Sequence, residues 1–202
     1  MSTQPASQPS GDAPTPTGWK PYLLAFAVGA VILTVMPLVQ TRFLKAPPPV
    51  LQLEPWQAGA VASTQLQGKV TLLTVEVGPC AQDCLERQQA FAALDPHLSD
   101  LGDGVVLVTL TDEAAAGAVQ QLASKAAGSR WKLGSTDDAL MTQLQKGLTQ
   151  FLGAENREFA RSHSLVLIDQ NDAVRGYWQG DVVGRGNAVN AARLLAKKGP
   201  QP

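Results

Sequence analysis

The pattern of apolar and polar residues separates an N-terminal part from a longer, regularly patterned part. Residues 1–19 are mostly Ser, Thr, Gln, Pro, Gly and Ala, which cannot bury enough apolar surface to fold, so we expect a disordered tail. From Pro21 to Thr41 no residue is charged. A helix needs about 20 mostly apolar residues to cross a bilayer, and Trp19 and Tyr22 are of the aromatic kind found at membrane interfaces. The pattern predicts a transmembrane anchor over residues 20–42.

A cleaved signal peptide is one alternative interpretation of the apolar run. Signal peptides have shorter apolar regions, of about 7–15 residues, followed by a small-residue cleavage site. Residues 40–45 contain no such site, so an uncleaved anchor is favoured. A buried core helix is the other alternative, but a Pro-rich tail precedes the run and Pro47-Pro48-Pro49 follows it. These prolines predict an extended spacer within a linker over residues 43–65.

Residues 66–198 show the pattern of a folded α/β domain. Short apolar runs rich in β-branched residues predict buried strands, and longer amphipathic segments predict helices. The last two strands are joined by a turn and followed by a helix, which is the pattern of a thioredoxin-like fold with a mixed sheet flanked by helices. In chain order we expect strand 70–77, helix 85–101, strand 105–110, helix 112–127, strand 131–133, a helix capped within 135–138 and ending at 151, strands 164–169 and 173–178, and helix 187–198.

Composition restricts the chemistry to a few residues. The chain has 202 residues and a formal net charge of −1, so nothing indicates a nucleic-acid partner. Its two cysteines, Cys80 and Cys84, are too few for a disulfide scaffold. They stand between the first predicted strand and the first predicted helix of the domain. Such a pair is a redox pair, a soft-metal site or a structural disulfide.

The spacing of the cysteines leaves these alternatives open. Two helical residues four apart have Cβ atoms about 5–6 Å from each other, whereas a disulfide needs about 3.5–4.5 Å. A disulfide therefore requires Cys80 to lie in the loop, which Gly78-Pro79 favours. A helix N-terminus lowers the pKa of a thiol, and this helps metal binding and thiol exchange equally.

A third ligand would favour the metal site, and the candidates are His97, Met141 and His163. We expect His97 at the surface near a helix end, and Met141 in the apolar face of a helix. His163 immediately precedes the strand expected at 164–169. In a thioredoxin-type fold that loop lies beside the cysteine motif, where oxidoreductases carry a cis-proline. Two thiolates and one imidazole suit Cu(I) best; Cu(II) could use the same ligands with water, and zinc would want a fourth ligand.

Three further segments complete the pattern: Gly68-Lys69-Val70 leading into a strand that ends at Cys80-x3-Cys84, the segment Trp131-x-Leu133-Gly134-Ser135, and the strand His163–Asp169 followed by Val174–Trp178. With these features the chain resembles the Sco/SenC family of copper chaperones over about residues 66–198. The single N-terminal anchor is typical of that family. Ser162 stands at a position that is usually acidic, so the chain would be a divergent member.

The resemblance implies a thioredoxin-like copper metallochaperone rather than an enzyme. Cys80, Cys84 and His163 would bind copper, preferably Cu(I), and the two cysteines would also form a redox disulfide. The protein would assist copper delivery to cytochrome c oxidase, with a subunit of that enzyme as partner. It would cross the cell inner membrane once, through lipid contacts of residues 20–42, with its C-terminal domain in the periplasm. A thiol–disulfide oxidoreductase that keeps a partner's cysteines reduced is the alternative function, and a domain with a structural disulfide is the third.

Overall fold

The computed structural model describes residues 47–125, 130–152 and 163–199. The predicted tail at 1–19, the predicted anchor at 20–42 and the first residues of the predicted linker lie outside these ranges. Among the described residues, no helix combines the length and the apolar character that a membrane crossing requires.

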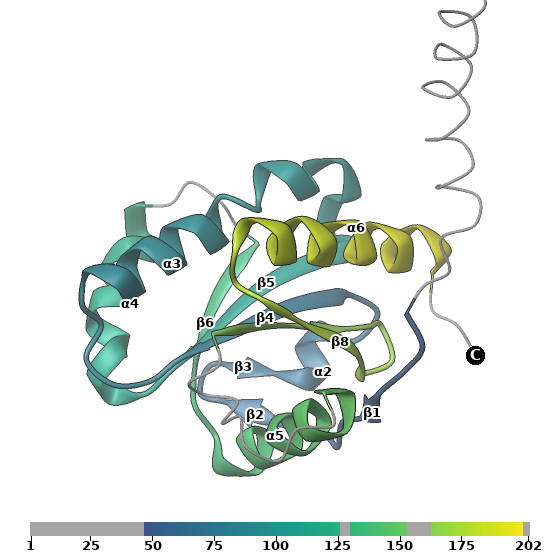
Figure 1. Cartoon of the computed structure of the whole chain (residues 1–202), viewed down its shortest axis with the longest axis horizontal. Helices are drawn as coiled ribbons and strands as arrows, with labels where there is room; N and C mark the ends of the chain where they lie inside the picture. The colour runs from purple at the N-terminus through teal and green to yellow at the C-terminus, as the bar shows by residue number, and fades with distance from the viewer. Residues whose placement is uncertain (1–46, 126–129, 153–162, 200–202) are drawn as a thin grey trace, which may run out of the picture. The chain divides into compact units, whose positions relative to one another are not determined.

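A six-stranded mixed sheet forms the centre of the domain, in the order β1-β8-β7-β4-β5-β6 (Figure 1). Strands β4, β5 and β6 run parallel to one another. Strands β7 and β8 form an antiparallel hairpin, and β7 pairs antiparallel with β4. All residues of β4, β5 and β7 are buried, as nearly continuous apolar runs predict. The strands are β1 (Leu51–Gln52), β4 (Val70–Glu76), β5 (Val105–Thr111), β6 (Trp131–Ser135), β7 (Ser164–Ile168) and β8 (Ala173–Gln179).

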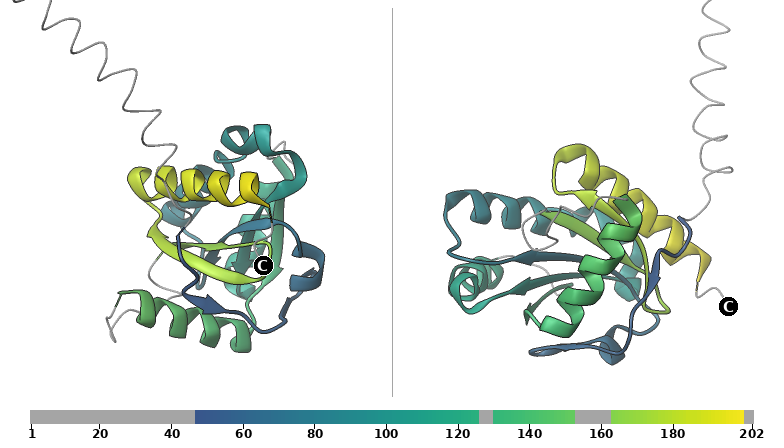
Figure 2. Two further views of the ribbon diagram at one scale, coloured as in Figure 1. Left: turned by 90° about the vertical axis from the view of Figure 1, so that its right-hand side faces the viewer. Right: turned by 60° about the horizontal axis from the view of Figure 1, so that its bottom comes forward.

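Helices cover both faces of the sheet (Figure 2). On one face α3 (Gln82–Ala92) and α6 (Val182–Lys198) enclose an apolar cluster, with α4 (Glu113–Lys125) in contact with α3. On the other face α5 (Asp138–Leu152) buries Leu140, Leu144 and Leu148. The remaining elements are the short hairpin of β2 (Gln57–Ala58) and β3 (Val61–Ala62), the helix α2 (Ser63–Leu66) and the 3-10 helix η1 (Pro96–Gly104).

The structure confirms the predicted mixed sheet and the order of its main elements. The helix bounds differ from the predicted ones, and two helix ends differ most. The helix predicted to run to residue 101 ends at Ala92, because Pro96 lacks an N–H and its ring would clash with the carbonyl of Ala92. The helix predicted from residue 187 begins at Val182 instead. There the Asp181 side chain accepts a hydrogen bond from the Gly184 N–H at 2.7 Å and caps the helix.

The domain also begins earlier than residue 66, where we expected the linker to end. Residues 51–66 contain β1, the β2–β3 hairpin and α2, and β1 pairs with β8 at the edge of the sheet. Leu53, Trp56 and Leu66 are buried in the core cluster under α5. Most of the segment predicted as a linker is therefore part of the folded domain.

Candidate redox and metal site

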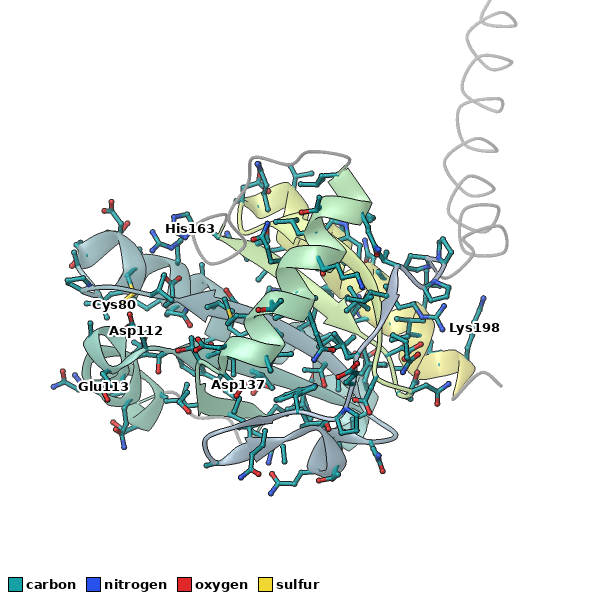
Figure 3. The ribbon with its side chains drawn as sticks, turned by 90° about the horizontal axis from the view of Figure 1, so that it is seen from below. Cys80, Asp112, Glu113, Asp137, His163 and Lys198 are labelled. Carbon is teal, nitrogen blue, oxygen red and sulfur yellow. A yellow bond between two sulfur atoms is a disulfide. The ribbon has the colours of Figure 1, made fainter. Side chains whose placement is uncertain are left out.

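Cys80 and Cys84 are joined by a disulfide at the N-terminal end of α3 (Figure 3). Cys80 lies in the loop after β4, and α3 begins at Gln82, so only Cys84 is helical. The two Cα atoms are 5.2 Å apart, inside the range usual for disulfides. The first cysteine therefore lies outside the helix, as the spacing requires for a bridge.

The two cysteines differ in their access to solvent. Cys84 is 5% exposed, whereas Cys80 is half-buried. Thiol–disulfide exchange begins when a thiolate attacks a sulfur that it can reach. Cys80 is therefore the sulfur that a partner's thiol would meet first.

The loop that carries Cys80 is held by a carboxylate from the next strand. Asp112 follows β5, and its Oδ2 accepts a hydrogen bond from the Gly78 N–H at 2.6 Å. Its Oδ1 accepts a second bond, from the Ala115 N–H in the first turn of α4, at 2.9 Å. One side chain thus connects the cysteine loop to the start of another helix.

The strand that leads into this loop ends in a buried carboxylate. Glu76 is 4% exposed. Its two oxygens accept bonds from Arg87 Nε at 3.1 Å and Arg87 Nη2 at 2.9 Å, and Oε1 also accepts one from Gln88 Nε2 at 3.0 Å. The bond to Glu76 is the main reason that the pKa of Arg87 is raised. Arg87 and Gln88 both belong to α3, so their bonds to Glu76 attach the cysteine helix to β4.

Two further hydrogen bonds continue from Gln88 across the sheet. The Thr109 hydroxyl donates to Gln88 Oε1 at 2.9 Å and accepts from Trp131 Nε1 at 3.0 Å. Our reading of the sequence missed this network. The available signal was Glu76, a single charged residue in an otherwise uncharged strand, because a buried charge needs a partner.

His163 is exposed and lies directly before β7 with a φ of 49°. Its carbonyl accepts a hydrogen bond from the Gly180 N–H at 3.0 Å. Together with Glu76, Arg87 and Arg185 it lines a small cavity beside α3, and neither cysteine is among the residues that line this cavity. Within the ranges that the structure describes, no group of three or more His, Cys, Asp or Glu side chains is placed to hold a metal ion.

The disulfide form thus does not assemble the three predicted ligands. The two sulfurs are bonded to each other, so metal binding requires reduction first. Copper ligation by Cys80, Cys84 and His163 remains a prediction. The other two candidates lie where the sequence placed them: His97 is exposed on η1, and Met141 packs against the core under α5.

No family model matches the chain, and no curated protein matches it. Among solved structures, it is similar to BsSco, a member of the Sco family of cytochrome c oxidase assembly proteins, with a TM-score of 0.55 and 13% identity, covering 76% of this chain and 98% of that one.

Two further structures extend the comparison. A SCO1/SenC family lipoprotein from Bacillus anthracis matches with a TM-score of 0.54 and 18% identity, over 76% of this chain and 99% of that one. A thiol:disulfide interchange protein of the thioredoxin family from Chlorobium tepidum matches with a TM-score of 0.50 and 12% identity, over 76% and 99%. Such low identities establish the fold alone. This chain therefore has the thioredoxin-like α/β fold that Sco/SenC proteins and thiol:disulfide interchange proteins share.

Proposed function

We propose that this chain is a Sco-like copper metallochaperone in which Cys80 and Cys84 act as a thiol–disulfide switch. In the oxidised form the sulfurs are bonded to each other and hold no metal. An external thiol reductant would supply the two electrons and two protons that convert the disulfide to two thiols, and would itself leave as a disulfide. In the reduced form, the two cysteines would release their thiol protons and, with the imidazole of His163, bind one Cu(I) as cargo. The disulfide at the start of α3, in a Sco-like fold, is the observation that carries the proposal.

The chemistry of the three side chains supports Cu(I) as the cargo. Thiolates are soft ligands that select Cu(I), and imidazole also suits copper. The N-terminus of α3 favours the thiolate form of both cysteines. His163 is exposed, so its ring can turn toward the sulfurs without leaving a buried position. Cu(II) would need additional water ligands and would bind as the less favoured form.

We further propose a membrane location and a copper recipient for this protein. Residues 20–42 anchor the protein in the lipid of the cell inner membrane, and the domain that follows lies in the periplasm. The recipient is a subunit of cytochrome c oxidase. The uncharged run in the sequence supports the anchor, and the likeness to BsSco, from a family of cytochrome c oxidase assembly proteins, supports the recipient.

Anaerobic titration of the full-length chain in detergent tests the site. After reduction and removal of the reductant, we expect one Cu(I) per chain in competition with a chromogenic chelator, and none for the oxidised chain. His163→Ala should weaken the affinity by at least about tenfold, since a direct ligand costs no less than an outer-shell partner. The matched control is His97→Ala, which changes the only other histidine and should bind like the wild type. Equal affinity of His163→Ala and wild type would rule out the three-ligand site.

A thiol–disulfide oxidoreductase is the second candidate function. The half-buried Cys80 and the buried Cys84, joined in a disulfide, favour it. The reduced pair would give two electrons and two protons to a partner's disulfide and close into the Cys80–Cys84 bond. Reduction of a model disulfide substrate that is abolished by Cys80→Ser but unchanged by His163→Ala, together with no Cu(I) binding, would establish this alternative.

A further inference from the structure

Asp112 connects three segments that meet beside the cysteine loop (Figure 3). Its carboxylate accepts the Gly78 N–H at 2.6 Å and the Ala115 N–H at 2.9 Å. Its own N–H donates to the Glu76 carbonyl at 3.3 Å. Both carboxylate oxygens are therefore used by backbone groups, one in the cysteine loop and one in α4. Bonds of this kind, between N–H and an ionised carboxylate, are among the stronger hydrogen bonds of proteins.

The bond to Gly78 determines how the chain approaches Cys80. Gly78 has a φ of 83°, in the left-handed region that favours glycine. A Cβ atom built on Gly78 would have no neighbour within 4 Å, so packing around that position does not impose the turn. Two residues later, Cys80 is bonded to Cys84, which is fixed in α3. The carboxylate of Asp112 is thus a side-chain contact that holds the loop between β4 and Cys80.

From this geometry we propose that Asp112 is a positioning residue that stabilises the disulfide form of the pair. A disulfide requires the two Cβ atoms to stay about 3.5–4.5 Å apart, whereas two thiols carry no such requirement. Holding Gly78 lowers the entropy that the loop loses when the bond closes. The inference rests on the proposed function only in that the pair must open and close.

The test is the equilibrium between the full-length chain and glutathione. Two glutathione thiols give two electrons and two protons to the Cys80–Cys84 disulfide and leave as oxidised glutathione. In Asp112→Ser, the hydroxyl still caps α4 but is too short to reach Gly78 as well. We expect the equilibrium constant for reduction to rise about tenfold, the effect of losing one charge-assisted hydrogen bond. Amide hydrogen exchange at Gly78 should also become faster.

Two control variants distinguish the loss of the Gly78 hydrogen bond from the change of helix cap and from the loss of a negative charge. Asp137 caps α5 through the Leu140 N–H at 2.8 Å, as Asp112 caps α4, so Asp137→Ser reproduces the change of cap elsewhere. Asp83, exposed in the first turn of α3, provides a charge control, because Asp83→Asn removes a carboxylate beside Cys84. We expect the equilibrium constant of Asp137→Ser to equal that of the wild type. Asp83→Asn should change it by much less than Asp112→Ser, since exposed charges are screened.

Each outcome decides the proposal. Faster exchange at Gly78 with an unchanged equilibrium constant would overturn it, as would an equal shift in Asp83→Asn. If Asp112→Ser does not fold, Asp112→Asn keeps one acceptor oxygen and should show a smaller shift in the same direction; no shift would then overturn the proposal. The glutathione equilibrium contains no copper, so it is independent of the Cu(I) titration described above. A shifted equilibrium constant together with no Cu(I) binding in that titration would retain the role of Asp112 and remove the metallochaperone function. Cu(I) binding together with an unshifted equilibrium constant would retain the metallochaperone function and remove the role of Asp112.

Discussion

Two carboxylates lie close together in the turn between β7 and β8. Asp169 is buried, and pairs with Arg175, whose Nε donates to Oδ2 at 2.6 Å. Asp172 is half-buried with a φ of 60°, and burial, with a smaller contribution from the charge of Asp169, raises its pKa above 3.8. A carboxyl whose pKa is raised on folding favours the fold when protonated. Its ionisation therefore reduces stability as the pH rises from 3.8 through the folded pKa.

Asp172→Asn should stabilise the protein at neutral pH. Asn carries no charge beside Asp169 and adopts a positive φ readily. Allowing for solvent screening at this half-buried position, we expect a gain in unfolding free energy of up to about 1 kcal/mol at pH 7. The gain should disappear below the unfolded pKa, where Asp172 is protonated in both states.

Urea unfolding at about pH 7 and about pH 3 measures this difference on either side of the carboxyl pKa range. Asp103→Asn changes an exposed aspartate and should leave the unfolding free energy unaltered at both pH values. An equal gain for Asp172→Asn at both pH values would contradict the electrostatic explanation and leave only the backbone preference of Asn.

At the scale of elements, the ion pair of Glu76 and Arg87 decides how firmly α3 is attached to β4. Arg87→Met should lower the unfolding free energy by about 3 kcal/mol, because it leaves the charge of Glu76 buried without its counter-ion. The double variant Glu76→Gln with Arg87→Met should recover a large part of this loss, because no buried charge remains. Chemical unfolding of the wild type, both single variants and the double variant gives the coupling energy.

An exposed ion pair supplies the comparison for this cycle. Arg193 and Asp100 are 3.6 Å apart, with side chains 38% and 51% exposed. Asp100→Asn should lower the unfolding free energy by less than about 1 kcal/mol, as is usual for surface pairs.

For the buried pair, additive effects of Glu76→Gln and Arg87→Met on the unfolding free energy would mean that the two residues do not act as a pair.

On the scale of the whole domain, the Cys80–Cys84 disulfide closes a short loop and supplies only part of the stability. The cysteines are 4 positions apart in the sequence, so closing this loop removes only about 2 kcal/mol of unfolded-state entropy. Domains of this size are stable by about 5–15 kcal/mol. We therefore expect the reduced chain to remain folded, with a melting temperature about 4–8 °C below that of the oxidised chain.

Circular dichroism melts with and without a reductant measure this shift. The double variant Cys80→Ser with Cys84→Ser should melt like the reduced wild type and should not respond to the reductant. Unfolding of the wild type on reduction at room temperature would show that the disulfide is structural, and would contradict both proposed functions.

Much of the fold could be predicted because its signals are local. The strands β4, β5 and β7 are short apolar runs, and their complete burial follows from that composition. The short edge strand β1 could not be found in this way. It consists of Leu51 and Gln52 and exists only because it pairs with β8, more than 100 residues later in the chain. A strand of two residues is too short to show an apolar–polar pattern, and its distant pairing partner leaves no signal in the neighbouring sequence.

The sequence by itself determined the mixed α/β domain, the two cysteines and the condition that Cys80 lie outside the helix if the two form a disulfide. Only the tertiary structure decided what surrounds them, because contacts between distant segments depend on the packing of the sheet. It placed Asp112 against Gly78 and Glu76 against Arg87, and it left His163 lining a cavity apart from the disulfide. A residue's type and spacing indicate which bonds it can make, whereas the folded backbone determines which partners lie within bonding distance.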